Sequence, residues 1–236
     1  MGGENIKSIV KNSTITKPIY HLIRNIKELY RKKRRKDGIK VFEKSSLIVM
    51  KSIQDIFQNY PDQLDYFFAY GTLLGIIRDG KLLSRDMDLD MVVFLENDEK
   101  ISEFRKFLKK NGFKRLHSFY IDNVGINQDA FIFQNVMVDI NYAKPAGNRY
   151  YNYNFYDLPE EKNKVLIFPF TYSGSEKYTF ESISINIPKN PDIYLEETYG
   201  KEWKIPNPKY IYWENPQTIK TELKGRVENV RKFKYR

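Results

Sequence analysis

The sequence contains no cysteine and only two histidines, His21 and His117. Without cysteine the chain cannot form a disulfide bond, a zinc–thiolate centre or a thiolate nucleophile. Both histidines lie away from the acidic segment described below, so the pattern offers neither a Ser-His-Asp arrangement nor a histidine-based metal site. We therefore expect no zinc, and the lack of cysteine is consistent with a reducing compartment.

Long apolar runs are also lacking. No N-terminal segment is long enough for a signal peptide or a membrane-spanning helix, so we expect a cytoplasmic protein. The 236 residues, of which 41% are hydrophobic and 30% charged, suit one compact globular domain with appendages. Aromatic residues make up 15% of the chain and can serve both a core and sugar-stacking surfaces.

Acidic residues are outnumbered by basic ones, which gives a net charge of +10. Part of this excess lies in residues 18–36, PIYHLIRNIKELYRKKRRK, which we predict to form a basic amphipathic helix that ends near Gly38. Two interpretations are open: peripheral contact with an anionic membrane at its inner face, or a solvated helix with a docked apolar stripe. No known reader motif accompanies the basic cluster, which argues against nucleic acid. The polar residues 1–16 are predicted to fray.

The most informative stretch is residues 66–95, YFFAYGTLLGIIRDGKLLSRDMDLDMVVFL, which predicts a strand, a Gly-Thr turn, a short helix, a loop and a second strand. Asp86, Asp88 and Asp90 alternate there, so in an extended chain their side chains share one face at spacings of about 6–7 Å. Like charges at that distance raise each other's pKa unless a cation lies between them. The pattern predicts a site for one or two Mg²⁺ or Mn²⁺ ions. A solvent-facing acidic loop is the alternative, and the apolar run MVVFL that follows argues against it.

The Gly71-Thr72 turn precedes the short helix and is a candidate site for a donor phosphate. Backbone N–H groups and a hydroxyl at the start of a helix bind anions, and glycine permits close approach. Two roles are open to Arg78: it either reaches the phosphate or pairs with one of the aspartates.

The remaining pattern predicts an α+β fold with a small mixed sheet backed by helices. We divide the chain into a basic N-terminal helical extension (1–40), a catalytic domain (41–210) and a basic C-terminal tail or helix (211–236). Lys144 and Arg149 lie in a polar, aromatic loop at 141–157 and are candidate substrate contacts. The expected helices are 40–60, 97–111 and 192–199, and the further strands are 113–121, 130–134, 136–142, 164–170 and 182–187.

The order of Gly71, Thr72, Leu73, Leu74, Gly75 and Arg78 before Asp86, Asp88 and Asp90 resembles the LicD/fukutin-related family of phosphotransferases. The segment 190–208, NPDIYLEETYGKEWKIPNP, resembles the closing motif of that family. The resemblance implies a nucleotidyltransferase fold of the polymerase-β kind. It also implies that a third carboxylate comes from a strand beside the acidic strand. Asp139 is the first candidate and Asp129 the competitor, so the expected catalytic residues are Asp88, Asp90 and Asp139.

The resemblance further implies a reaction. Relatives transfer a phospho-alcohol, such as phosphocholine or a ribitol or glycerol phosphate, from a CDP-activated donor to a sugar hydroxyl and release CMP. The acceptor is a surface or lipid-linked glycan. One alternative is transfer of NMP from an NTP to a small molecule, a protein or RNA. Another is a non-catalytic basic adaptor that binds a membrane or nucleic acid.

Overall fold

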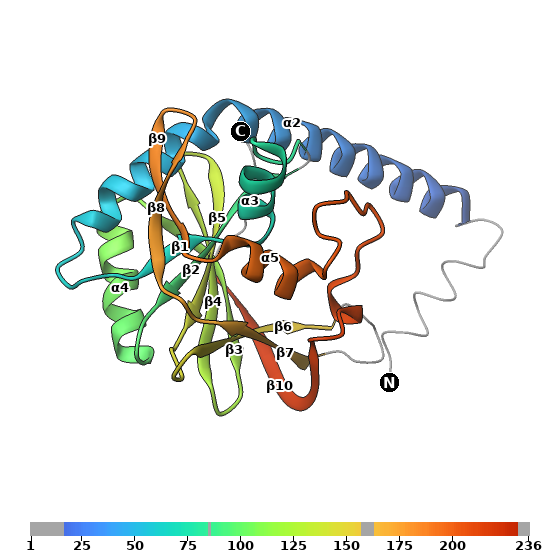
Figure 1. Cartoon of the computed structure of the whole chain (residues 1–236). Helices are drawn as coiled ribbons and strands as arrows, with labels where there is room; N and C mark the ends of the chain where they lie inside the picture. Colours follow the sequence, from blue (N-terminus) through green and yellow to red (C-terminus); the bar gives the residue numbers. More distant parts are fainter. Residues whose placement is uncertain (1–16, 85, 157–162, 231–236) are drawn as a thin grey trace.

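The computed structural model describes residues 17–84, 86–156 and 163–230 (Figure 1). The prediction made for residues 1–16 falls outside these ranges. Strands β1 to β7 and β10 form an eight-stranded sheet in the order β1-β2-β5-β4-β3-β10-β7-β6, and β8 and β9 form a hairpin. Only β2 and β5 pair in parallel among the described strand pairs. The predicted α+β class and the mixed sheet backed by helices are therefore confirmed.

The elements have the following bounds. The helices are α2 (Lys17–Gln58), α3 (Tyr70–Leu74), the π-helical turn η1 (Gly75–Asp79), α4 (Asp98–Lys110), α5 (Pro191–Tyr199) and the short 3₁₀ helix η3 (Tyr212–Glu214). The first strands are β1 (Tyr66–Phe68), β2 (Asp88–Phe94), β3 (Lys114–Ile121), β4 (Gly125–Phe133) and β5 (Val136–Ala143). The others are β6 (Arg149–Phe155), β7 (Lys164–Thr171), β8 (Ser175–Phe180), β9 (Ile183–Pro188) and β10 (Ile219–Asn229).

The two helices predicted on either side of Gly38 are one continuous helix, α2, so the predicted stop is wrong. A glycine inside a helix costs only about 1 kcal/mol relative to alanine, and no proline interrupts residues 19–58. In the N-terminal half, Leu22 and Leu29 are 59% and 66% exposed, so these two apolar residues do not dock on the domain. None of the helices in the described ranges is long and apolar enough to cross a membrane.

The helices cover the two faces of the sheet differently (Figure 1). The C-terminal part of α2 and the whole of α4 lie together on one side, where Phe57 packs edge-on against Phe104 at 5.3 Å. On the other side α3 contacts both β2 and α5. Beneath α4, residues such as Leu89 and Met91 of β2 are fully buried. One hydrophobic core thus fixes β2 and leaves its alternate residues facing α3 and α5.

The C-terminal segment departs from its prediction as a basic helix or tail. Residues 219–229 form β10, which pairs with β3 on one side and with β7 on the other. Its alternating sequence, ITLGV between charged residues, has the period of a strand with one face turned inward. Likewise, residues 149–155 of the predicted loop form β6, and β8 was not predicted.

Gly225 shows why β10 fits there. A Cβ atom at this position would lie 2.7 Å from the carbonyl oxygen of Tyr120 and 2.8 Å from the ring of Phe155. The backbone of β3 cannot retreat without losing strand pairing, so only glycine permits this close approach.

Replacing Gly225 with alanine should therefore destabilise the whole domain by about 1–3 kcal/mol, the usual effect of overpacking. Lys224→Ala, at the neighbouring exposed position, is the matched control and should change stability little. Chemical denaturation of both variants measures the difference. Equal stability of the two variants would show that β10 is not held against β3 as described.

Candidate active site

The parallel pairing of β2 with β5 brings two acidic residues side by side. Asp90 of β2 stands opposite Asp139 of β5 in the register. Asp88 lies two residues before Asp90 on the same strand face, and Asp86 lies in the loop that leads into β2. The predicted alternation therefore holds for Asp88 and Asp90, whereas Asp86 approaches from outside the strand.

Gly71 forms the wall opposite these carboxylates. A Cβ atom on Gly71 would lie 3.1 Å from Oδ2 of Asp86 and 3.6 Å from Oδ2 of Asp90. The backbone N–H of Gly71 also donates a hydrogen bond to the Asp90 carboxylate. Glycine is suited here because a side chain would crowd both acids.

Thr72 has a different role from the predicted phosphate contact. Its side chain is fully buried, and its Oγ1 accepts a hydrogen bond of 2.9 Å from the backbone N–H of Asp90. The backbone N–H of Ala69 donates to the carbonyl oxygen of Asp90 at 2.9 Å. The start of α3 is thus attached to β2 at Asp90, and Thr72 positions that residue.

The acids perturb one another. Burial, and then the nearby charge of Asp88, raises the pKa of Asp139 to about 8. The same two causes raise the pKa of Asp86 to about 6. Burial followed by the charges of Asp88, Asp139 and Asp86 raises the pKa of Asp90 well above its usual value, and burial also raises that of Asp88. These four residues form the acidic cluster, which lacks a compensating cation from the described residues.

The acidic cluster fits a hard divalent cation in charge and in donor chemistry. The Oδ1 atom of Asp139 is buried and has no hydrogen-bond partner in the described parts of the chain, while Oδ2 accepts a hydrogen bond of 3.2 Å from Gln128. An unpaired buried carboxylate oxygen is costly and is well satisfied by a metal ion. In this conformation, no group of three or more Asp, Glu or His side chains among the described residues is arranged to hold an ion. The match is therefore one of chemistry and not of a preformed ligand set.

The three predicted basic contacts form no ion pair with the acidic cluster in the part of the chain that the structure describes. Arg78 forms a bidentate ion pair with its neighbour Asp79, at 2.8 and 2.9 Å, and not with the acidic cluster. Lys144 and Arg149 are exposed, and neither lines the two cavities that adjoin the acids. Within the predicted loop, the residues that reach the site are Tyr153 and Asn154 of β6.

Two cavities adjoin the acidic cluster. The first, of about 350 Å³, contains Asp90 and Asp139 and is lined by seven aromatic side chains and by the amides of Gln128, Asn141 and Asn154. The second, of about 650 Å³, contains Gly71, Arg78 and Asp86 together with residues 199–207. We call them the aromatic cavity and the glycine-turn cavity. The aromatic side chains of the first are Tyr70, Phe119, Tyr153, Phe168, Tyr199, Tyr210 and Tyr212.

Tyr199 and Tyr210 line both cavities, and their ring centroids lie 5.0 Å apart. Tyr70 has a backbone φ of 45°, a strained value for a bulky residue, and its hydroxyl is hydrogen-bonded to Asn152. Sequence reasoning did not assign these tyrosines to the site. The only available signal was that Tyr199 lies in the segment 190–208, which resembles the closing motif of the family.

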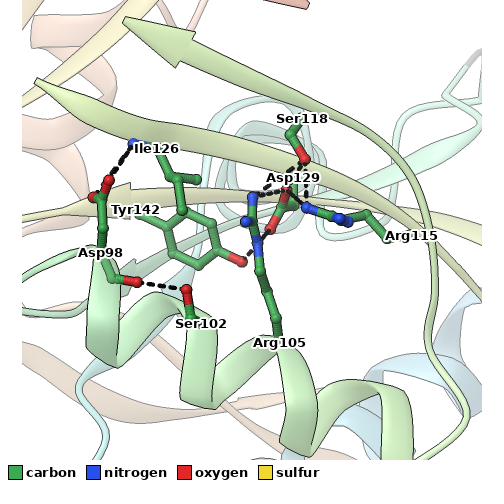
Figure 2. Close-up of polar contacts among 8 residues, drawn as sticks. All are labelled: Asp98, Ser102, Arg105, Arg115, Ser118, Ile126, Asp129 and Tyr142. Carbon is green, nitrogen blue, oxygen red and sulfur yellow. Dashed lines mark hydrogen bonds and ion pairs between the residues drawn. The ribbon is translucent and has the colours of Figure 1, made fainter. Parts of the chain in front are cut away.

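Asp129 is not part of the site. Its register partner on β5 is Ile140, so its side chain lies on the opposite sheet face from Asp139. It is fully buried, where Arg105 contacts both of its oxygens at 2.6 Å, and Ser118 and Tyr142 donate to it at 2.5 and 2.7 Å (Figure 2). The carboxylate is compensated and has a structural role under α4.

Comparisons with known proteins agree with this geometry. The model of the LicD/FKTN/FKRP nucleotidyltransferase domain matches residues 63–190, which is more than half of the chain and includes the whole acidic cluster. No curated protein matches the sequence. Eleven chains of solved structures match. One is the crystal structure of ANT(2")-Ia in complex with adenylyl-2"-tobramycin, which is 11% identical, covers 70% of this chain and 80% of that chain, and has a TM-score of 0.37. A TM-score this low carries no argument about the site.

The raised pKa values predict how stability depends on pH and metal. The pKa of Asp139 is about 8, above the usual value of about 4, so the stability linked to its proton is present at low pH and is lost as pH rises through 8. Without metal the chain should therefore become less stable between about pH 5 and pH 8, and the loss should level off above pH 8. A divalent ion competes with this proton, so Mg²⁺ or Mn²⁺ at about 10 mM should raise the melting temperature more at high than at low pH. Thermal unfolding with metal or with EDTA measures both effects.

The Asp139→Asn variant serves as the reference, since it should lose the part of the pH dependence below pH 8 that Asp139 contributes and most of the metal effect. Asp122→Asn, at an exposed aspartate, should behave like the unmodified chain. Equal metal stabilisation in all three proteins would exclude the acidic cluster as the ion site.

Proposed function

Because the chain belongs to the LicD/FKTN/FKRP family through its nucleotidyltransferase domain, we propose that it is a metal-dependent phosphotransferase. It moves a phospho-alcohol from a CDP-activated donor to a sugar hydroxyl of a surface or lipid-linked glycan and releases CMP. The observation that carries the proposal is the register of Asp90 against Asp139 beside the Gly71 backbone. Two half-buried acids that no described lysine or arginine pairs with lie next to the close backbone of Gly71, and this arrangement suits a charged diphosphate and its counter-ions.

The acidic residues supply the ion site. Asp86, Asp88, Asp90 and Asp139 would hold one or two Mg²⁺ or Mn²⁺ ions, which neutralise charge on the transferring phosphate and on the leaving group. Asp139 has a second task. Asp139 lines the aromatic cavity, where its carboxylate accepts the proton of the attacking hydroxyl.

The two cavities divide the substrates. The glycine-turn cavity offers Arg78, Lys201 and the close backbone of Gly71, and it takes the donor diphosphate. The aromatic cavity offers flat apolar rings and three side-chain amides around Asp139, and it takes the acceptor sugar. The acceptor oxygen bonds to the phosphorus that carries the alcohol, and the bond from that phosphorus to the bridging oxygen breaks. CMP leaves with the electron pair, and the proton passes to Asp139.

Transfer of a nucleotide is the second candidate, because the matching family domain is a nucleotidyltransferase domain. The same acids and turn would then bind a nucleoside triphosphate. The released product separates the two reactions, since phospho-alcohol transfer gives CMP and nucleotidyl transfer gives pyrophosphate.

The proposal is tested by incubating the chain with Mg²⁺, CDP-choline, CDP-ribitol or CDP-glycerol and a glycan extract, and by measuring CMP. Asp90→Asn and Asp139→Asn should each lower CMP release by about 10²–10⁴-fold, the range for loss of a catalytic acid–base group. Asp122→Asn should leave it unchanged. Pyrophosphate release from nucleoside triphosphates, with no CMP from any CDP-alcohol, would favour the second candidate instead.

The division of the cavities is tested by CDP binding alone. Lys201→Gln removes an exposed cation from the glycine-turn cavity and should weaken CDP binding about fivefold, corresponding to about 1 kcal/mol. Tyr153→Ala alters only the aromatic cavity and should change CDP affinity less than twofold while it impairs acceptor use. Isothermal titration calorimetry gives both affinities, and the reverse pattern would exchange the two assignments.

A further inference from the structure

A third cavity, of about 480 Å³, lies on the sheet face opposite the acidic cluster. It opens between the C-terminal half of α4 and the start of β3, and Val230 lines it just beyond β10. Arg105 of α4 lines this cavity and contacts Asp129, whose side chain lies on the sheet face opposite Asp139 (Figure 2). This cavity is separate from the proposed active site.

The lining of the third cavity has one sign of charge. Five of its nine residues are cations and none is an acid: Arg105, Lys106, Lys109, Lys114 and Arg115. The three lysines are exposed, and across the described ranges none of them forms an ion pair. Phe113 and Phe131 form an apolar wall, each only 2% exposed. Charges beside an apolar wall are less screened than charges in open water.

The floor of the third cavity carries an imbalance of charge. Two guanidinium groups, those of Arg105 and Arg115, meet at the single carboxylate of Asp129 (Figure 2). Arg105 takes both oxygens at 2.6 Å, which leaves Arg115 3.9 Å from Oδ1 and bonded at 3.0 Å to Ser118. The Arg115 side chain is only 28% exposed. One half-buried positive charge is therefore left over in the cavity that the lysines also line.

We propose that the third cavity is a binding site for a phosphate group. A phosphate offers several acceptor oxygens to the planar fork of Arg115 and to the ammonium groups of the lysines. Its two negative charges would compensate the surplus cation on the floor and part of the charge on the rim. The site does not depend on the proposed function, because none of its residues belongs to the acidic cluster or to the two cavities beside it.

The phosphate can be free in solution or part of a lipid headgroup, and two probes separate these sources. Inorganic phosphate is titrated into the whole chain with EDTA present, so that no ion assists binding at the acidic cluster. Amide chemical shifts of residues 105–115 should move and saturate. Flotation with phosphatidylcholine vesicles that contain phosphatidic acid, compared with phosphatidylcholine alone, tests the lipid source.

A charge-matched pair of variants decides the outcome. The triple substitution Lys106→Gln, Lys109→Gln and Lys114→Gln should weaken binding by at least about tenfold. Lys51→Gln, Lys189→Gln and Lys220→Gln removes the same net charge from exposed positions elsewhere and should change binding less than twofold. Arg115→Lys keeps the charge but loses the fork, and should also weaken binding.

Saturable binding of either probe that is lost in the first triple variant and kept in the second supports the phosphate site and identifies its source. Equal loss in both triple variants would mean that net charge alone attracts the probe. Shifts confined to other residues, or binding of neither probe, would likewise overturn the proposal. Circular dichroism checks that each variant is folded, and the exposed lysines contribute little to the core.

Discussion

Mutual repulsion between half-buried carboxylates is the constraint around which this protein is arranged. The parallel pair β2 and β5 holds Asp90 opposite Asp139, and burial together with neighbouring acids raises the pKa of both. Across the described residues, no lysine or arginine pairs with them. The surrounding fold holds the acids in place against this repulsion. The hydroxyl of Thr72 accepts a hydrogen bond from the backbone N–H of Asp90, and the backbone N–H of Gly71 donates one to its carboxylate. Strain of this kind, kept by a rigid scaffold, is typical of sites that await a ligand.

The opposite face of the same sheet shows what a structural carboxylate looks like. Asp129 is the neighbour in sequence of Ala130, which is the register partner of Asp139. Its carboxylate nevertheless accepts hydrogen bonds from Arg105, Ser118 and Tyr142. Removing such a partner leaves an uncompensated buried charge, which is why these groups act together. The contrast separates the two candidates for the third carboxylate. Asp139, whose Oδ1 has no hydrogen-bond partner in the described parts of the chain, is therefore the residue that we propose as the third carboxylate.

Local patterns predicted the centre of the molecule better than its edges. The period-two acids after an apolar strand required only the geometry of one strand, and the place of Asp139 followed from the resemblance. Helix α2 continues through Gly38 because a single glycine destabilises a helix by only about 1 kcal/mol relative to alanine, which is too little to end it. Strand β10 depended on partners in β3 that lie more than a hundred residues earlier in the chain, and Gly225 fits against them because it has no side chain. The tyrosines of the aromatic cavity were not predictable from the sequence. Tyr70, Tyr199 and Tyr210 come together only through the packing of α3 and residues 199–210 around the sheet.

The charge of the whole chain and the charge of its site have opposite signs, and this opposition has a physical use. A net charge of +10 attracts anions over distances up to about one Debye length, roughly 8–10 Å at physiological salt. The acidic cluster repels those same anions at contact, unless cations accompany them. Long-range attraction and short-range repulsion together favour ligands that arrive with a metal ion, such as a nucleotide diphosphate. A protein with the same acidic centre but no net positive charge would bind the ion and would lose the attraction. A basic site without acidic residues would bind any phosphate. Under the proposed function, the combination of a net positive charge with a compact acidic centre would favour phosphates that carry a metal ion over free phosphates.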